Sequence, residues 1–156
     1  MVEFLRLGSK RLPNLAGIKY SNSNIDEYRE CLKFENGRFN ILFGRDEMLL
    51  SAFSAGAKGA VGSTYNFAGP LYQRIIKAFE QDNLSEAQKY QDLSVEMIRI
   101  IFDHGGQAAL KAVMKLIGLD CGPNRLPLQT LKPEDLQAMK EELESIGFFD
   151  WALSAT

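Results

Sequence analysis

Three short apolar segments, each of which ends in polar residues just before a helical pattern, constrain the fold of this chain most strongly. They run from Leu15 to Tyr20, from Phe39 to Phe43 and from Gly59 to Gly62. Helical patterns over about 25–34 and 47–55 follow the first two segments. Strands that alternate with helices favour a parallel sheet, and the residues that end such strands gather at its carboxyl edge. The sequence therefore predicts an α/β fold.

Helical patterns also occupy both ends of the chain. We expect a first helix over residues 1–10, with Gly8 as its stop. After the third apolar segment the periodicity predicts four amphipathic helices, over about 71–80, 84–102, 107–117 and 133–145. An irregular loop is expected over 121–127. Asn24, Ser85 and Thr130 stand where helix caps are expected, and Pro133 suits a first helical turn.

The length of the chain limits the number of strand–helix units that it can contain. A closed (β/α)8 barrel needs eight strands and about 250 residues, whereas this chain has 156 residues and three strand–helix units. The alternatives are a small open sheet and the carboxyl-terminal part of a larger barrel.

Composition excludes several classes of partner. With a net charge of -2 and no run of like charge, the chain gives no reason to expect nucleic acid or an anionic membrane. No segment approaches the ~20 apolar residues that span a bilayer, and the start lacks the pattern of a signal peptide. Cys31 and Cys121 form no Cys-x-x-Cys, and the one histidine, His104, stands apart from them. We therefore expect reduced thiols, no metal site and a cytoplasmic location.

Lys19, at the end of the first apolar run, is the main candidate for chemistry. A lysine on a mostly apolar strand is expected to be desolvated, which lowers the pKa of its ammonium group. An unprotonated amine can attack a ketone and form a Schiff base. Taken alone, such a lysine is more often a partner in a surface ion pair. Asp46 and Glu47 could likewise have the purely structural role of beginning a helix, and Ser63 and Thr64 that of capping one.

Four segments resemble a known family. Residues 17–21 (Gly-Ile-Lys-Tyr-Ser) resemble the Schiff-base strand of the pyruvate-dependent class I aldolases, the superfamily of N-acetylneuraminate lyase and dihydrodipicolinate synthase. Residues 43–47 (Phe-Gly-Arg-Asp-Glu) are similar to the Gly-x-Asp-Glu motif of the lyases, and residues 62–66 (Gly-Ser-Thr-Tyr-Asn) match a segment characteristic of them. Residues 121–128 resemble a late segment of the animal-type lyases. The second and third motifs favour the lyase over the synthase.

The resemblance implies a role for each matching residue. Lys19 would be the nucleophile that attacks the keto carbon of a sialic acid, which is then cleaved to N-acetylmannosamine and pyruvate. The sugar site would be lined by Ser21, Gly44, Asp46, Glu47 and Ser63. The resemblance implies no metal and no dissociable cofactor, a small-molecule substrate and a homotetramer.

The chain also departs from the family pattern. The proton-transferring tyrosine and the loop that holds the pyruvate carboxylate belong to earlier strands in this family, and neither motif occurs here. We therefore expect the last three strand–helix units of a TIM barrel over residues 1–104 and a helical extension over 105–156. The alternatives to an active lyase are an inactive fragment or interaction module, and another pyruvate-dependent aldolase such as dihydrodipicolinate synthase.

Overall fold

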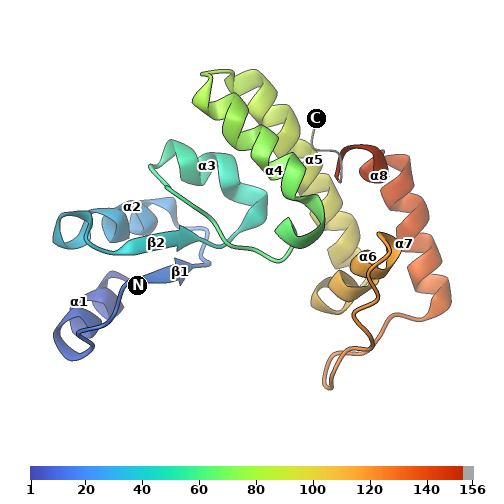
Figure 1. The fold of residues 1–156 in the computed structure, drawn as a ribbon, viewed down its shortest axis with the longest axis horizontal. Coiled ribbons are helices and arrows are strands. Elements are labelled where there is room, and N and C mark those ends of the chain that lie inside the picture. The colour runs from blue at the N-terminus through green and yellow to red at the C-terminus, as the bar shows by residue number, and fades with distance from the viewer. Residues whose placement is uncertain (153–156) are drawn as a thin grey trace. The chain divides into compact units, whose positions relative to one another are not determined.

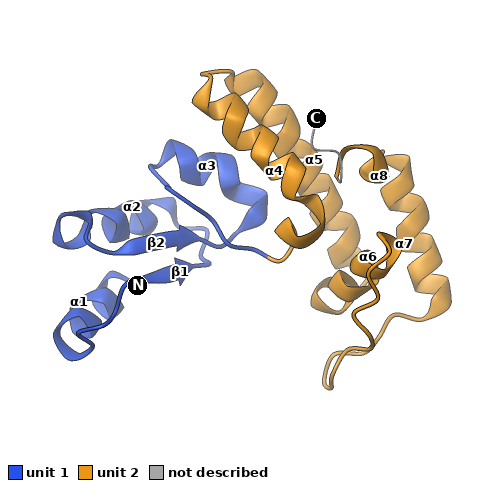
Figure 2. Ribbon diagram, in the orientation of Figure 1, with its two compact units in different colours: residues 1–62 blue, residues 63–156 orange. Residues whose placement is uncertain are grey.

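The chain forms two compact units in the computed structural model, which describes residues 1–152. The first unit runs from Met1 to Gly62 and the second begins at Ser63 (Figure 2). The first unit is α/β, as the sequence predicts, and the second is helical over its described residues. The sequence analysis divides the chain after residue 104, where the resemblance implies that the barrel ends. That boundary is of another kind than the division into compact units, and it stays a prediction.

Helices and strands alternate along the first unit (Figure 1). Its helices are α1 (Val2–Arg11), α2 (Ile25–Lys33) and α3 (Leu49–Ser54), and its strands are β1 (Gly17–Tyr20) and β2 (Asn40–Phe43). Two 3-10 turns, η1 (Phe34–Gly37) and η2 (Asp46–Met48), complete it. The Asn24 side chain accepts a hydrogen bond from the Glu27 backbone N–H at the start of α2, so the predicted cap is confirmed.

The sheet of this unit is parallel. β1 pairs with β2 from Gly17 opposite Asn40 to Tyr20 opposite Phe43. The third predicted strand is reduced to one parallel bridge between Phe43 and Ala60, flanked by bonds from Phe43 N to Gly59 O (3.1 Å) and from Val61 N to Phe43 O (2.9 Å). Gly59 and Gly62, at the two ends of this segment, offer no side chains that would pack against a neighbouring strand, which weakens the pairing.

Aromatic side chains fill the core between this sheet and α2. The rings of Tyr28 and Phe43 lie 5.0 Å apart between centroids, and those of Tyr20 and Tyr28 lie 5.3 Å apart. The Tyr28 hydroxyl donates to Ile41 O at 3.1 Å, and burial raises the pKa of Tyr28 to about 12. Cys31 is buried in the same core, and burial raises the pKa of its thiol.

Gly8 does not end the first helix. α1 continues to Arg11, and Gly8 lies buried inside it. A Cβ at position 8 would come within 2.8 Å of Leu15 Cδ2, so the glycine lets the chain before β1 pack closely on the helix. The prediction of a helix stop was wrong because a buried close approach also selects glycine.

The second unit consists of helices. They are α4 (Tyr65–Glu80), α5 (Leu84–Asp103), α6 (Ala109–Leu116), α7 (Pro133–Ser145) and α8 (Phe148–Trp151), with a 3-10 turn η3 (Gly106–Ala108) before α6. α4 and α5 pack along each other (Figure 1). His104 follows the end of α5, and its Nε2 lies 2.9 Å from Glu142 Oε1 on α7. None of the helices within residues 1–152 is both long and apolar enough to cross a bilayer.

One helix start and two helix caps in this unit differ from the prediction. α4 begins at Tyr65 rather than near Leu71, because a kink at Ala68 accommodates Pro70 inside the helix. Asn83, not Ser85, caps α5 by accepting from the Glu86 backbone N–H. The Thr130 hydroxyl accepts from Asn124 N at 3.0 Å instead of capping α7, which starts with Pro133 at its first turn as predicted.

Candidate active site

Lys19 and Ser21 lie together at the carboxyl end of β1, over Gly44 at the end of β2. Parallel pairing brings these strand ends to one edge, where Gly44 N donates to Tyr20 O at 2.8 Å. A Cβ on Gly44 would lie 2.6 Å from Lys19 Cε and 2.5 Å from Ser21 Oγ. The two side chains therefore occupy the space that any larger residue at position 44 would need. Residues from the first two sequence motifs thus form one cluster.

Asp46 enters this edge from the turn after β2. Its side chain is buried, at 6% exposed, and its carboxylate lies against the Cα of Gly62. A Cβ on Gly62 would overlap both carboxylate oxygens of Asp46. Sequence reasoning missed this second close approach, although Gly62 opens the third motif. The first unit therefore holds a buried carboxylate between the ends of β2 and the third apolar segment.

Glu47 is held by its neighbour Arg45. Arg45 Nε donates to Glu47 Oε1 at 3.0 Å, and Arg45 Nη2 donates to the same oxygen. The side chains are 38% and 30% exposed, so solvent reaches the pair. Arg45 occupies the variable position of the Gly-x-Asp-Glu motif and was not predicted to have a role. A guanidinium group thus fixes the orientation of the Glu47 carboxylate in the turn that follows β2.

Lys19 is not desolvated in this structure. Its side chain is exposed, although the strand that carries it is short and partly apolar. Tyr20, the next residue, is fully buried, because successive side chains of a strand point to opposite faces. The expected desolvation was therefore wrong for this chain, and the predicted role of Lys19 has to rest on its neighbours.

Ser63 is the first residue of the second unit. It is exposed, and its carbonyl oxygen accepts from the Asn66 side chain at 2.9 Å. This contact ties together two residues of the Gly-Ser-Thr-Tyr-Asn motif at the start of α4. Ser63 belongs to the second unit, so its place in the sugar site stays a prediction.

Thr64 does not serve as a helix cap. It stands before α4, but its hydroxyl makes no cap bond and instead lies 2.6 Å from the Tyr72 hydroxyl. Ser94 Oγ on α5 donates to the same Tyr72 oxygen at 3.0 Å. All three side chains are buried. This hydroxyl chain fixes the start of α4 to α5, and the sequence offered no signal for it beyond the polar residues themselves.

The Tyr20 hydroxyl is hydrogen-bonded to residues at the start of α2. It donates to Asn24 O at 2.7 Å and to Glu27 Oε2 at 2.9 Å, on the α2 side of the unit. Burial, followed by the hydrogen bond to Glu27, raises the pKa of Tyr20. A phenol that is buried and bonded in this way is poorly suited to proton transfer.

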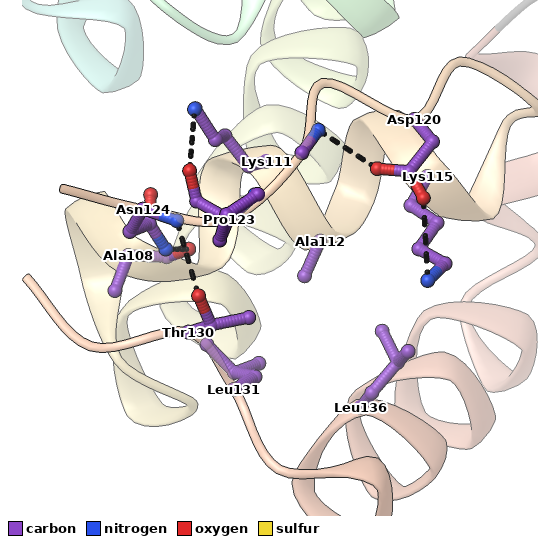
Figure 3. Close-up of a pocket in the computed structure, with 11 residues that line it drawn as sticks. Ala108, Lys111, Ala112, Lys115, Asp120, Pro123, Asn124, Thr130, Leu131 and Leu136 are labelled. Carbon is purple, nitrogen blue, oxygen red and sulfur yellow. Dashed lines mark hydrogen bonds and ion pairs between the residues drawn. The ribbon is translucent and has the colours of Figure 1, made fainter.

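The second unit contains a cavity of about 230 Å³ beside α6 (Figure 3). Lys111 Nζ donates to Pro123 O at 2.9 Å and Cys121 O at 3.2 Å. The bond from the Gly122 N–H, with Lys115 second, lowers the pKa of Asp120. These bonds fasten the irregular loop that the sequence predicts over 121–127. The polar groups around the cavity mainly hold this loop, and we assign no ligand to it.

No metal centre is evident in the part of the chain that the structure describes. Among residues 1–152, no group of three His, Cys, Asp or Glu side chains is placed to hold a metal ion. The expectation that the chemistry needs neither a metal nor a dissociable cofactor stays a prediction, and it follows from the amine of Lys19 rather than from this observation.

Comparison with known proteins identifies the family. A model of the dihydrodipicolinate synthetase family matches residues 3–146. The N-acetylneuraminate lyase of Gallus gallus is 41% identical over 144 residues, which are 90% of this chain and 47% of that protein. The chain spans about half the length of the curated relatives it matches.

Solved structures agree with this assignment. The N-acetylneuraminate lyase (sialic acid aldolase) of Aliivibrio salmonicida superposes with a TM-score of 0.90 and 39% identity, over 95% of this chain and 49% of that one. A Ruminococcus gnavus sialic acid aldolase described as a catalytic lysine mutant gives a TM-score of 0.82 and 29% identity, over 92% of this chain and 48% of that one. These matches confirm the resemblance that the motifs indicate. The chain belongs to the dihydrodipicolinate synthetase family.

Proposed function

We propose that this chain carries the Schiff-base residues of an N-acetylneuraminate lyase, a class I aldolase that cleaves N-acetylneuraminate to N-acetylmannosamine and pyruvate. The observation that supports this most is the cluster of Lys19, Ser21 and Gly44, in which the lysine motif and the Gly-x-Asp-Glu motif meet at one edge. The similarity to lyases at 36–41% identity supports the same activity.

In the proposed reaction, the Lys19 amine attacks the keto carbon of the open-chain sugar acid, and loss of water gives an iminium ion. The iminium accepts the electron pair of the carbon–carbon bond that breaks one carbon further along. The hydroxyl proton beyond that bond leaves as the aldehyde of N-acetylmannosamine forms. Protonation of the resulting enamine and addition of water release pyruvate and restore the amine. A lysine therefore supplies the electron sink that other lyases obtain from a cofactor.

The sugar is held in this proposal by Ser21, Gly44, Asp46, Glu47 and Ser63. Carboxylates accept hydrogen bonds only, so they suit a chain of hydroxyl donors. The fixed orientation of Glu47 beside Arg45 supports such a role, because a preoriented acceptor loses less freedom on binding. The lysine mutant described for the R. gnavus enzyme supports a catalytic lysine in this family.

The proposed architecture is that of the last three strand–helix units of a (β/α)8 barrel, over residues 1–104, with a helical extension over 105–156. The chain covers about half of each of two solved lyases, which supports this architecture. We further propose a homotetramer in the cytoplasm, with no nucleic acid or membrane as partner and no metal or cofactor.

Two other functions remain in competition. One is an inactive chain or interaction module, which is favoured by the lack of the family's proton-transferring tyrosine motif and carboxylate loop in the sequence. The other is a different pyruvate-dependent aldolase such as dihydrodipicolinate synthase, which Glu47 and the Gly-Ser-Thr-Tyr-Asn segment fit poorly.

The rate of pyruvate release from N-acetylneuraminate distinguishes the lyase from the other two functions. The purified chain is given N-acetylneuraminate, and the pyruvate formed is followed through lactate dehydrogenase and NADH. The lyase proposal predicts pyruvate release that is lost in Lys19→Arg and reduced in Glu47→Gln. Pyruvate release that persists in Lys19→Arg would contradict it. No release from the folded wild-type chain would favour the inactive alternative.

A further inference from the structure

A kink separates the first turn of α4 from the rest of the helix. Ala68 has a non-helical backbone conformation, with φ of -131°. Pro70 lies inside the helix and has no N–H to donate to the carbonyl of Asn66, four residues earlier. One of the hydrogen bonds that normally fix a first turn to the body of its helix is therefore missing here. The turn that follows the Gly-Ser-Thr-Tyr-Asn motif needs another means of attachment.

The hydroxyl chain crosses this kink. Thr64 stands before the kink and Tyr72 after it, and their hydroxyl oxygens lie 2.6 Å apart. Ser94 Oγ donates to the Tyr72 oxygen at 3.0 Å, which ties Tyr72 to α5. The Tyr72 ring also packs edge-on against the ring of Tyr65, with 4.3 Å between centroids. The turn before the kink is therefore attached to the long part of α4 and to α5 by side chains rather than by the helical backbone.

Ser63 belongs to the turn that is held in this way. Its carbonyl oxygen accepts from Asn66 Nδ2 at 2.9 Å and from Asn66 N at 3.3 Å. The next carbonyl oxygen, that of Thr64, accepts from Phe67 N at 3.2 Å and Ala68 N at 2.9 Å. These bonds make the turn one unit, so a displacement of Thr64 also displaces Ser63.

We propose that Tyr72 and Ser94 are positioning residues for Ser63. They act through Thr64, whose hydroxyl they hold from the far side of the kink. This inference rests on the proposed lyase function, in which Ser63 lines the sugar site and pyruvate is attached to Lys19. Loss of the hydroxyl chain therefore weakens the binding of N-acetylneuraminate and leaves the reaction of pyruvate with Lys19 unchanged.

The test uses the full chain and four variants. Tyr72→Phe removes the central hydroxyl and keeps the ring that packs against Tyr65. Thr64→Val removes the hydroxyl next to Ser63, whereas Thr64→Ser keeps it. Ile101→Val, at a fully buried residue of α5, is the matched control, because it loosens packing in the same unit and takes no part in the hydroxyl chain. Circular dichroism checks that all four variants fold.

Hydrogen exchange measures the hold on the turn without any substrate. The backbone amides of Phe67 and Ala68 report on it, because they donate to Thr64 O. We expect these amides to exchange about five-fold faster in Tyr72→Phe and Thr64→Val, relative to amides in the middle of α5. Thr64→Ser and Ile101→Val are expected to keep the wild-type ratio. An unchanged ratio in Tyr72→Phe and Thr64→Val would overturn the attachment across the kink.

Two further measurements separate the sugar from pyruvate. Calorimetric titration on a Lys19→Arg background gives the affinity for N-acetylneuraminate, and borohydride trapping gives the rate at which pyruvate reacts with Lys19. We expect Tyr72→Phe and Thr64→Val to weaken the affinity by about five-fold or more and to leave the trapping rate unchanged. Thr64→Ser and Ile101→Val are expected to keep both values.

Unchanged affinity in Tyr72→Phe and Thr64→Val, or an equal loss in Ile101→Val, would overturn the positioning role. A trapping rate that falls as far as the affinity would overturn the restriction of that role to the sugar. A wild-type chain that neither binds N-acetylneuraminate nor traps pyruvate would count against the lyase function itself, while the exchange ratios would still test the attachment of the turn. The two failures are therefore distinguishable.

Discussion

The Cα of Gly44 faces the side chain of Lys19 so closely that a methyl group there would lie 2.6 Å from Lys19 Cε and 3.0 Å from Lys19 Cγ. The lysine therefore reaches the carboxyl edge of the sheet only because position 44 has no side chain. The glycine of one motif and the lysine of another form one structural unit, and substitution of the glycine tests that unit directly.

Gly44→Ala is expected to displace Lys19 and Ser21 and to slow formation of a pyruvyl adduct by at least about ten-fold, because the nucleophile loses its position. Mass spectrometry of the adduct over time measures this. Gly69→Ala is the matched control, since nothing lies within 4 Å of a Cβ there. That change lies in α4, outside the first unit, and is expected to leave the rate of adduct formation unaltered. Equal adduct rates in both variants would refute the role of Gly44.

Arg45→Met is expected to release Glu47 with little effect on folding. The pair is partly exposed, so its loss changes the free energy of unfolding by less than about 1 kcal/mol. Affinity for N-acetylneuraminate is expected to fall several-fold, because Glu47 is no longer oriented. Calorimetric titration on a Lys19→Arg background, which prevents reaction, measures it. Unchanged affinity would show that Arg45 does not position Glu47 for the sugar.

Tyr72→Phe is expected to destabilise the chain by about 1–3 kcal/mol, because the buried hydroxyls of Thr64 and Ser94 lose their shared partner. Urea unfolding followed by circular dichroism measures the change. Tyr90→Phe removes a half-buried hydroxyl bonded to Glu86 at 3.1 Å and serves as the control, with an expected change below about 0.5 kcal/mol. Similar losses in both variants would argue against a special role for the hydroxyl chain.

Stability is expected to fall at alkaline pH. Burial raises the pKa of Tyr28 from 10.0 to about 12, so the folded chain keeps a proton that the unfolded chain releases. This contribution is complete below about pH 10 and is lost as the pH rises toward 12. Burial raises the pKa of Tyr20 in the same direction. In Tyr28→Phe the decrease measured by urea unfolding across this range is expected to be smaller, and an identical decrease would contradict the assignment.

The sequence predicts the alternating elements of the first unit well, because hydrophobic periodicity reports which faces are buried. It also predicts the cap at Asn24 and the meeting of the motif residues around Gly44, because both depend on which residues stand at the ends of helices and strands. Gly8 and Ala60 show the limit. A glycine inside α1 and a single bridge in place of a strand depend on what packs against them, which a local pattern does not report.

The exposure of Lys19 and the position of Thr64 show a second limit. The apolar neighbours of Lys19 predict burial, but burial of a side chain also depends on what lies beside the strand, and here β1 is an edge. Thr64 stands where a cap belongs, yet its hydroxyl bonds to Tyr72, eight residues later. Contacts between distant residues decide both cases.

The measurement that tests the central claim most directly is the intact mass of the purified chain after incubation with pyruvate and borohydride, with peptide mapping of any adduct. The account predicts one pyruvyl adduct per chain, located on Lys19 and absent from Lys19→Arg. An equal adduct in Lys19→Arg, or no adduct on the folded wild-type chain, would contradict it.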